Sequence, residues 1–112
     1  MNNETLKTQV KDYLRHQFGL PADQIDLMMP EFKKTLSQHM NSLILADQQE
    51  NLTILKEAAH TMKGALLNLG FKGSAQLAQK IENESSAGNR EIDYSLLIDT
   101  IKKTVLDFVD ER

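Results

Sequence analysis

The sequence contains no cysteine, and this absence excludes several kinds of site. A chain without thiols has no disulfide, no zinc site with cysteine ligands and no cysteine nucleophile. Because disulfides belong to oxidising compartments, their absence favours a reducing one, and we expect a cytoplasmic protein. The polar first ten residues, MNNETLKTQV, agree with this expectation, since they lack the apolar segment of a signal peptide.

Long apolar runs and clusters of basic residues are also lacking. No run approaches the roughly 18 apolar residues that a membrane-spanning helix needs, so we expect no membrane as a partner. The formal net charge is −3, and the lysines and arginines are spread along the chain. Since nucleic-acid-binding proteins concentrate positive charge on one face, we expect no nucleic acid as a partner either.

Glycine and proline are scarce, with five and two residues in a chain of 112. No sustained alternation of β-branched and polar residues indicates a strand. The length suits one domain, and the content of 40% hydrophobic and 26% charged residues is typical of a folded globular chain. The sequence therefore predicts a single all-α domain.

Turn-forming residues divide the first part of the chain. A helix is expected over about residues 4–17, where apolar residues recur at helical spacing. Gly19 follows this helix in the position of a C-terminal glycine cap. A short turn or helix is expected from Pro21, and Pro30 is expected in the first turn of the second long helix, where its missing N–H is not needed.

The second part of the chain predicts three more helices with short connections, and so a helical bundle. Asp47 followed by Glu50 has the form of a capping box at the start of the third long helix. The segments GFKG at 70–73 and NESSAGNR at 83–90 are expected to precede the fourth and fifth helices. The third helix has an apolar seam with the spacing found in left-handed bundles, formed by Leu52, Leu55, Ala59, Met62, Leu66 and Leu69.

The third helix also carries a histidine that should face outward. At about 100° per residue, the mean direction of the seam lies about 130° from His60 and about 170° from Gly64. Gly64 is one turn after His60 and leaves space beside the imidazole ring, which is a candidate reason for a glycine that costs roughly 1 kcal/mol inside a helix. Lys63 is the other neighbour, and its flexible side chain can bring a positive charge to an anion on His60.

These features suit the transient attachment of a phosphoryl group to imidazole. The segment HTMKGALLNLGFKGSAQLAQKIE, residues 60–82, resembles the histidine-containing phosphotransfer (Hpt) domains of two-component phosphorelays, whose pattern is His-x-x-Lys-Gly followed by a further glycine. The resemblance covers roughly residues 29–110. It implies an antiparallel up-and-down four-helix bundle with an additional N-terminal helix. On this basis we expect an N-terminal helical extension of residues 1–28, packed on a bundle of residues 29–112.

The resemblance also implies the roles of four residues. It makes His60 the phosphorylated residue, with Nε2 as the nucleophile. Lys63 then helps to neutralise the phosphoryl oxygens, and Gly64 gives an incoming receiver domain access. Members of the family place a glutamate or glutamine on the next helix to hold the histidine. Here that position is Glu82, which can accept a hydrogen bond from Nδ1–H and leave Nε2 unprotonated.

Two more residues are candidate contacts with the partner. Leu67 departs from the small residues that the family often has here, and it lies about 110° from the seam, so we expect it to add an apolar contact to the docking surface. Lys72 lies in the segment before the fourth helix and is the other candidate. The implied partners are receiver domains of response regulators and of hybrid sensor histidine kinases, and we expect a monomer.

No glycine-rich nucleotide loop and no acidic metal-binding cluster occurs in the sequence. We therefore expect a phosphocarrier that has no ATP site, no autokinase activity and no cofactor of its own. The expected reaction is attack by neutral His60 on the aspartyl phosphate of a receiver domain, with reversal onto another receiver. The receiver would supply Mg²⁺ and most of the electrostatic stabilisation of the transition state.

The sequence disfavours two other interpretations. A helical adaptor that binds receiver or kinase domains without accepting phosphate is disfavoured by the pairing of His60 with Lys63. The dimerisation helices of a sensor histidine kinase would have an acidic residue directly after the histidine, where this chain has Thr61.

The sequence leaves open whether the chain is free-standing or part of a hybrid kinase. It also leaves open the stimulus, the direction of phosphate flow, the identity of its kinase and response regulator, and the role of residues 1–28.

Overall fold

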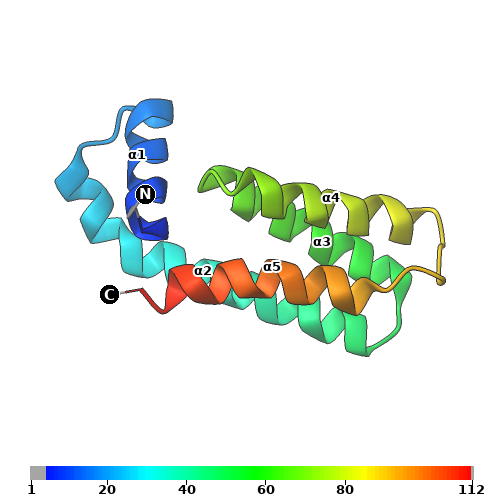
Figure 1. The fold of residues 1–112 in the computed structure, drawn as a ribbon. Coiled ribbons are helices and arrows are strands. Elements are labelled where there is room, and N and C mark those ends of the chain that lie inside the picture. Colours follow the sequence, from blue (N-terminus) through cyan, green and yellow to red (C-terminus); the bar gives the residue numbers. More distant parts are fainter. Residues whose placement is uncertain (1–4, 112) are drawn as a thin grey trace.

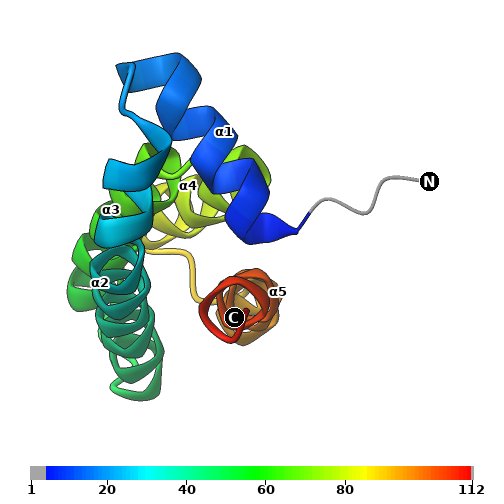
Figure 2. The ribbon, with the colours of Figure 1, turned by 90° about the vertical axis from the view of Figure 1, so that its left-hand side faces the viewer.

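The computed structural model describes residues 5–111, which form five helices and, within this range, no strand. The helices are α1 (Leu6–Phe18), α2 (Ala22–Gln48), α3 (Leu52–Asn68), α4 (Lys72–Ser86) and α5 (Tyr94–Val109). Helices α2 to α5 run up and down beside one another, and α1 crosses one end of them (Figure 1, Figure 2). The predicted all-α bundle with an additional N-terminal helix is confirmed.

The core lies between the helices of the bundle, and each of the five helices contributes buried apolar side chains to it. In α3 the predicted seam is buried at Leu55, Ala59, Met62 and Leu66, whereas Leu52 in the first turn is half-buried. None of the helices within residues 5–111 is long and apolar enough to cross a lipid bilayer. The largest fully buried side chains are Phe108, Ile25, Leu36, Leu43, Met62, Leu66, Ile81, Ile101, Val10 and Val105.

Helix α1 has a cap at each of its ends. Glu111, beyond the end of α5, accepts hydrogen bonds from the backbone N–H groups of Leu6 and Lys7 at 2.8 and 2.6 Å. A carboxylate at this position satisfies free N–H groups and is favoured by the helix dipole. At the other end, Gly19 takes a φ of 66°, as predicted for a glycine cap. The expected start of this helix at residue 4 lies outside the described residues.

The expectation that Pro30 lies in the first turn of the second long helix is wrong. Helix α2 begins at Ala22, with Pro21 as its N-cap, and Pro30 lies inside it. A proline in a helix interior removes one hydrogen bond and costs about 3 kcal/mol. The helix continues through the proline because Met29 before it and Leu36 after it are buried on the same face, while Pro30 itself is exposed.

The division of the chain into an extension of residues 1–28 and a bundle of residues 29–112 stays a prediction. Helix α2 is continuous across this boundary. Helix α1, which belongs to the predicted extension, packs against both α2 and α5.

The predicted capping box at the start of the third long helix is also wrong. Asn51 caps α3, because its Oδ1 accepts hydrogen bonds from two backbone N–H groups of the first turn at 3.0 and 3.1 Å. Asp47 lies in the last turn of α2 and accepts a hydrogen bond of 2.6 Å from the hydroxyl of Ser95. Glu50 takes a φ of 54°, in the left-handed region, so the chain leaves α2 here and the next polar side chain caps α3.

Tyr13 in α1 packs on the loop between α3 and α4. Gly70 in this loop takes a φ of 85°, a conformation that favours glycine. A Cβ atom at Gly70 would lie 2.6 Å from Cγ of the Tyr13 ring. This close contact fixes α1 against the end of the α3–α4 pair.

We expect Gly70→Ala to lower the free energy of unfolding by about 2–4 kcal/mol, through backbone strain and the clash with Tyr13. Gly88→Ala is the matched control, because Gly88 has a φ of 75° and nothing within 4 Å of an added Cβ. Strain alone should cost this control about 1 kcal/mol. Urea denaturation measures both losses, and equal losses would show that Tyr13 does not constrain the loop.

Candidate functional site

His60 lies in the middle of α3, on the side of the helix that faces away from the core. The neighbouring Ala59 and Met62 are fully buried, whereas the side chain of His60 is 67% exposed. The outward direction predicted from the apolar seam is confirmed. The imidazole is thus accessible to another molecule.

Helix α4 approaches α3 closely and brings polar side chains to His60. These two helices form the most extensive helix pair of the structure. The buried face of α4 consists mostly of small residues, namely Ser74, Ala75, Ala78 and Ser85, with Ile81 as the one large side chain. Because the distance between helix axes depends on the side chains at the contact, small residues allow a close approach.

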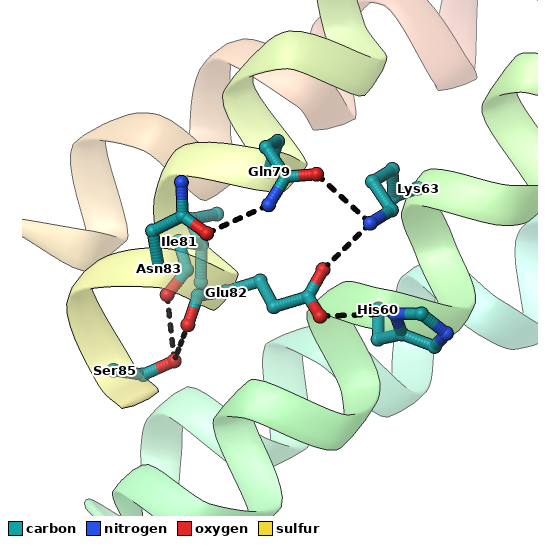
Figure 3. Close-up of polar contacts among 7 residues, drawn as sticks. All are labelled: His60, Lys63, Gln79, Ile81, Glu82, Asn83 and Ser85. Atoms are coloured by element: carbon teal, nitrogen blue, oxygen red, sulfur yellow. Dashed lines mark hydrogen bonds and ion pairs between the residues drawn. The ribbon is translucent and has the colours of Figure 1, made fainter. Parts of the chain in front are cut away.

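Glu82 on α4 forms a hydrogen bond with the imidazole of His60. Its Oε2 lies 2.9 Å from Nδ1 of the ring (Figure 3). Since an ionised carboxylate has only acceptors, this hydrogen bond requires the ring proton on Nδ1. In the neutral imidazole Nε2 then carries the free lone pair. Nε2 lies on the side of the ring that faces away from Glu82 (Figure 3).

Lys63, one turn after His60, joins the same carboxylate. Its Nζ donates to Oε1 of Glu82 at 2.9 Å and to Oε1 of Gln79 at 2.8 Å. Gln79 in turn donates through Nε2 to Oδ1 of Asn83 at 2.7 Å. The side chains of Lys63 and Glu82 are only 20% and 21% exposed. One carboxylate therefore contacts two side chains of α3, the exposed His60 and the partly shielded Lys63.

The charge of Glu82 follows from its surroundings. Partial burial acts to raise the pKa of this carboxyl, but the hydrogen bonds from Lys63 and His60 outweigh it, so the pKa lies below its ordinary value of 4.5. Glu82 is therefore ionised at neutral pH and favours a proton on Nδ1 of His60. Within residues 5–111, no group of three or more histidine, aspartate or glutamate side chains is placed to hold a metal ion.

The other predicted site residues lie in different places. Gly64 is one turn after His60, and a Cβ atom there would meet nothing within 4 Å. Leu67 lies two turns after His60 on the same side of α3 and is 45% exposed. Lys72 is exposed and is the first residue of α4, about 15 Å along that helix from Glu82. The structure thus groups Gly64 and Leu67 with His60 but places Lys72 away from Glu82.

The family model of the Hpt domain matches residues 27–107, which is more than half of the chain. The chain belongs to the Hpt domain family. Membership implies a phosphotransfer role in a phosphorelay, as a phosphocarrier and not as a kinase. Hpt domains interact with receiver domains. Searches of curated proteins and of solved structures found no significant match.

Sequence reasoning missed Gln79, which contacts Lys63 in this Hpt domain. Gln79 precedes Glu82 by three residues, and residues three apart share one face of a helix. This spacing was a usable signal: once Glu82 is placed beside His60, Gln79 is the next polar side chain on that face of α4.

We expect Glu82 to add about 1 kcal/mol to the stability of the Hpt domain at neutral pH, through its contacts with Lys63 and His60. Because folding lowers the pKa of Glu82, this contribution is present above pH 4.5 and is lost as the pH falls through the folded-state value. Glu82→Gln cannot ionise. The difference in free energy of unfolding between the parent and this variant should therefore shrink below pH 4.5.

Urea denaturation at a series of pH values between about 3 and 7 measures this difference. Glu57→Gln is the control, since Glu57 is an exposed residue of α3. The control should show no comparable change with pH. A difference between the parent and Glu82→Gln that stays constant over the whole range would contradict the lowered pKa.

Proposed function

We propose that this Hpt domain carries a phosphoryl group on His60 between two receiver domains. Nε2 attacks the phosphorus of an aspartyl phosphate, and a P–N bond forms as the P–O bond to the aspartate breaks. The aspartate leaves as a carboxylate. The reverse reaction transfers the group to the aspartate of a second receiver, which belongs to a response regulator or to a hybrid sensor histidine kinase.

The hydrogen bond between Nδ1 of His60 and Glu82 is the observation that carries this proposal. It keeps the ring proton on Nδ1, so that Nε2 is an unprotonated nucleophile without the help of a general base. The exposure of the ring leaves Nε2 open to a partner. When Nε2 gains the phosphoryl group and Nδ1 keeps its proton, the imidazole ring carries a positive charge, and the ionised Glu82 stabilises this charge.

The charges that the transfer needs come from two molecules. Lys63 supplies a positive charge near His60 for the phosphoryl oxygens. The receiver domain supplies Mg²⁺ and most of the stabilisation of the transition state, so the Hpt domain needs no nucleotide and no metal of its own. We also propose a cytoplasmic location, since receiver domains and this carrier must meet in one compartment. The proposed carrier is a monomer.

The receiver domain docks, in this proposal, on the face of α3 that carries His60. The exposed Leu67 offers an apolar contact there. Beside Gly64 lies a groove of about 650 Å³, whose mostly apolar walls include Phe18 of α1 and Phe32 of α2. Exposed apolar surface next to a reacting atom supports the docking of a protein partner. Lys72 is then a candidate contact at the edge of the interface.

Phosphotransfer from a panel of radiolabelled, phosphorylated receiver domains tests the proposal. The parent protein should take up acid-labile, base-stable label, and His60→Gln should take up none. His16→Gln is the matched control, because His16 is an exposed histidine of α1 that does not line the groove beside Gly64, and it should be labelled like the parent.

If the folded parent binds a receiver domain but takes no label from any of them, the chain is a helical adaptor. Label on His60→Gln would move the phosphorylated residue elsewhere in the chain.

Gly64→Ala should separate stability from function. We expect a gain of up to about 1 kcal/mol in the free energy of unfolding, because alanine favours a helix and the added methyl meets nothing in this chain. The transfer rate should fall about tenfold, because the methyl occupies space beside the ring that the receiver needs. Urea denaturation and transfer kinetics measure the two effects.

Gly73→Ala is the matched control, since Gly73 lies in the first turn of α4 and also has nothing within 4 Å of an added Cβ. It should keep the transfer rate of the parent. An unchanged transfer rate in Gly64→Ala would remove Gly64 from the docking surface.

A further inference from the structure

Lys63 is held by two acceptors on α4. Its ammonium group contacts Oε1 of Gln79 at 2.8 Å and Oε1 of Glu82 at 2.9 Å, and its side chain is only 20% exposed. Gln79 is itself held, because its amide donates to Asn83 at 2.7 Å. The position of this lysine is therefore built by three side chains of one helix (Figure 3).

In the unphosphorylated protein both contacts of the Lys63 ammonium are with α4, the helix that Nδ1 of His60 also faces. The two nitrogens of an imidazole ring point in divergent directions, and here Nδ1 faces Glu82. Figure 3 shows Nε2 on the far side of the ring from Glu82, while the ammonium of Lys63 lies between Gln79 and Glu82. In the unphosphorylated protein Lys63 thus neutralises Glu82, and its charge is not directed at the site of phosphorylation.

We propose, on the basis of the phosphocarrier function above, that Gln79 is a positioning residue that holds Lys63 on α4. When His60 is phosphorylated, Lys63 leaves Gln79. The phosphoryl group brings two negative charges to Nε2, against the single charge of Glu82. Lys63 exchanges its contacts on α4 for the phosphoryl oxygens. Glu82 keeps the Nδ1 proton of His60 as its partner during this exchange.

Gln79 therefore opposes phosphorylation of His60. Its hydrogen bond with Lys63 exists in the unphosphorylated state and is broken in the phosphorylated state. An ordinary hydrogen bond shifts an equilibrium by about threefold to tenfold, and a hydrogen bond to a charged group can exceed this range. The contact thereby lowers the stability of phosphohistidine and favours onward transfer to a receiver.

The equilibrium constant for transfer from a phosphorylated receiver domain to the Hpt domain tests this role. Gln79→Leu should shift the equilibrium toward phosphohistidine by about threefold to tenfold. In a Lys63→Met background the same substitution should have no effect, because the group that it releases is gone. Gln79→Ala is a second variant that should act in the same direction.

Gln76→Leu is the matched control. Gln76 is an exposed glutamine one turn earlier on α4. Its replacement should leave the equilibrium unchanged. A general effect of apolar substitution on α4 would appear in this control, whereas an effect through Lys63 would not.

Nuclear magnetic resonance of the lysine ammonium groups tests the hold on Lys63 without any phosphoryl group. Hydrogen exchange of the Lys63 ammonium should be slower than that of the exposed Lys80 in the parent, and it should become faster in Gln79→Leu. Equal exchange of Lys63 in the parent and the variant would overturn the holding role.

The outcomes separate this role from the phosphocarrier function. A parent protein that takes no label at His60 refutes both. A parent that is labelled, with an equilibrium that Gln79→Leu leaves unchanged, shifts the other way, or shifts equally in the Lys63→Met background, refutes only the role of Gln79.

Discussion

The site depends on how closely α4 can approach α3. The hydrogen bond between Glu82 and His60 is 2.9 Å long, and such bonds weaken beyond about 3.2 Å, so the two helices cannot move apart without losing it. Small residues on the buried face of α4, with Ala78 fully buried among them, permit this distance. Ser85 is buried without an unsatisfied hydroxyl, because it donates to the carbonyl of Ile81 in its own helix. The packing of the core therefore determines the geometry at the surface.

Within this geometry, one carboxylate controls two side chains of α3. His60 and Lys63 are three residues apart and share one side of the helix, so the two oxygens of Glu82 can serve both at once. The two contacts are coupled, since the charge that keeps the proton on Nδ1 is the same charge that attracts Lys63. Any change in the protonation or the partner of Glu82 must therefore reach both residues. Nε2, which faces away from Glu82, is left for chemistry.

The features that the sequence predicted correctly are those that local pattern determines. The seam of α3 gave the outward direction of His60, and the glycine cap at Gly19 needed only the end of an apolar repeat. Pro30 was misplaced because the burial of residues on both sides of it outweighs the local preference of proline. Asn51 was missed because Asp47 is an equally good cap by residue type, and the left-handed turn at Glu50 decides between them.

The contact of Gln79 with Lys63 could not be predicted from local pattern, because it depends on how α3 and α4 are rotated relative to one another. Residue spacing places Gln79 and Glu82 on one face of α4, but spacing within one helix does not say which face meets α3. The buried small residues supply that information, since they fix which side of α4 turns inward. A family pattern was needed to place Glu82 beside His60 from sequence, and no such pattern pointed to Gln79.

Two glycines near the site show how a requirement of the fold differs from a requirement of a partner. Gly70 has a positive φ and the ring of Tyr13 against it, so the chain itself demands a glycine there. Gly64 has helical neighbours on both sides and open space where a side chain would lie, and nothing within the described chain explains the loss of about 1 kcal/mol that a glycine causes there. Gly64 lowers the stability of the helix and lies one turn from an exposed nucleophile. The best explanation for a glycine here is a second molecule that must come close to the helix. The constraint on Gly64 therefore comes from a partner and not from the chain itself. This partner approaches the same face of α3 that carries the free Nε2 of His60.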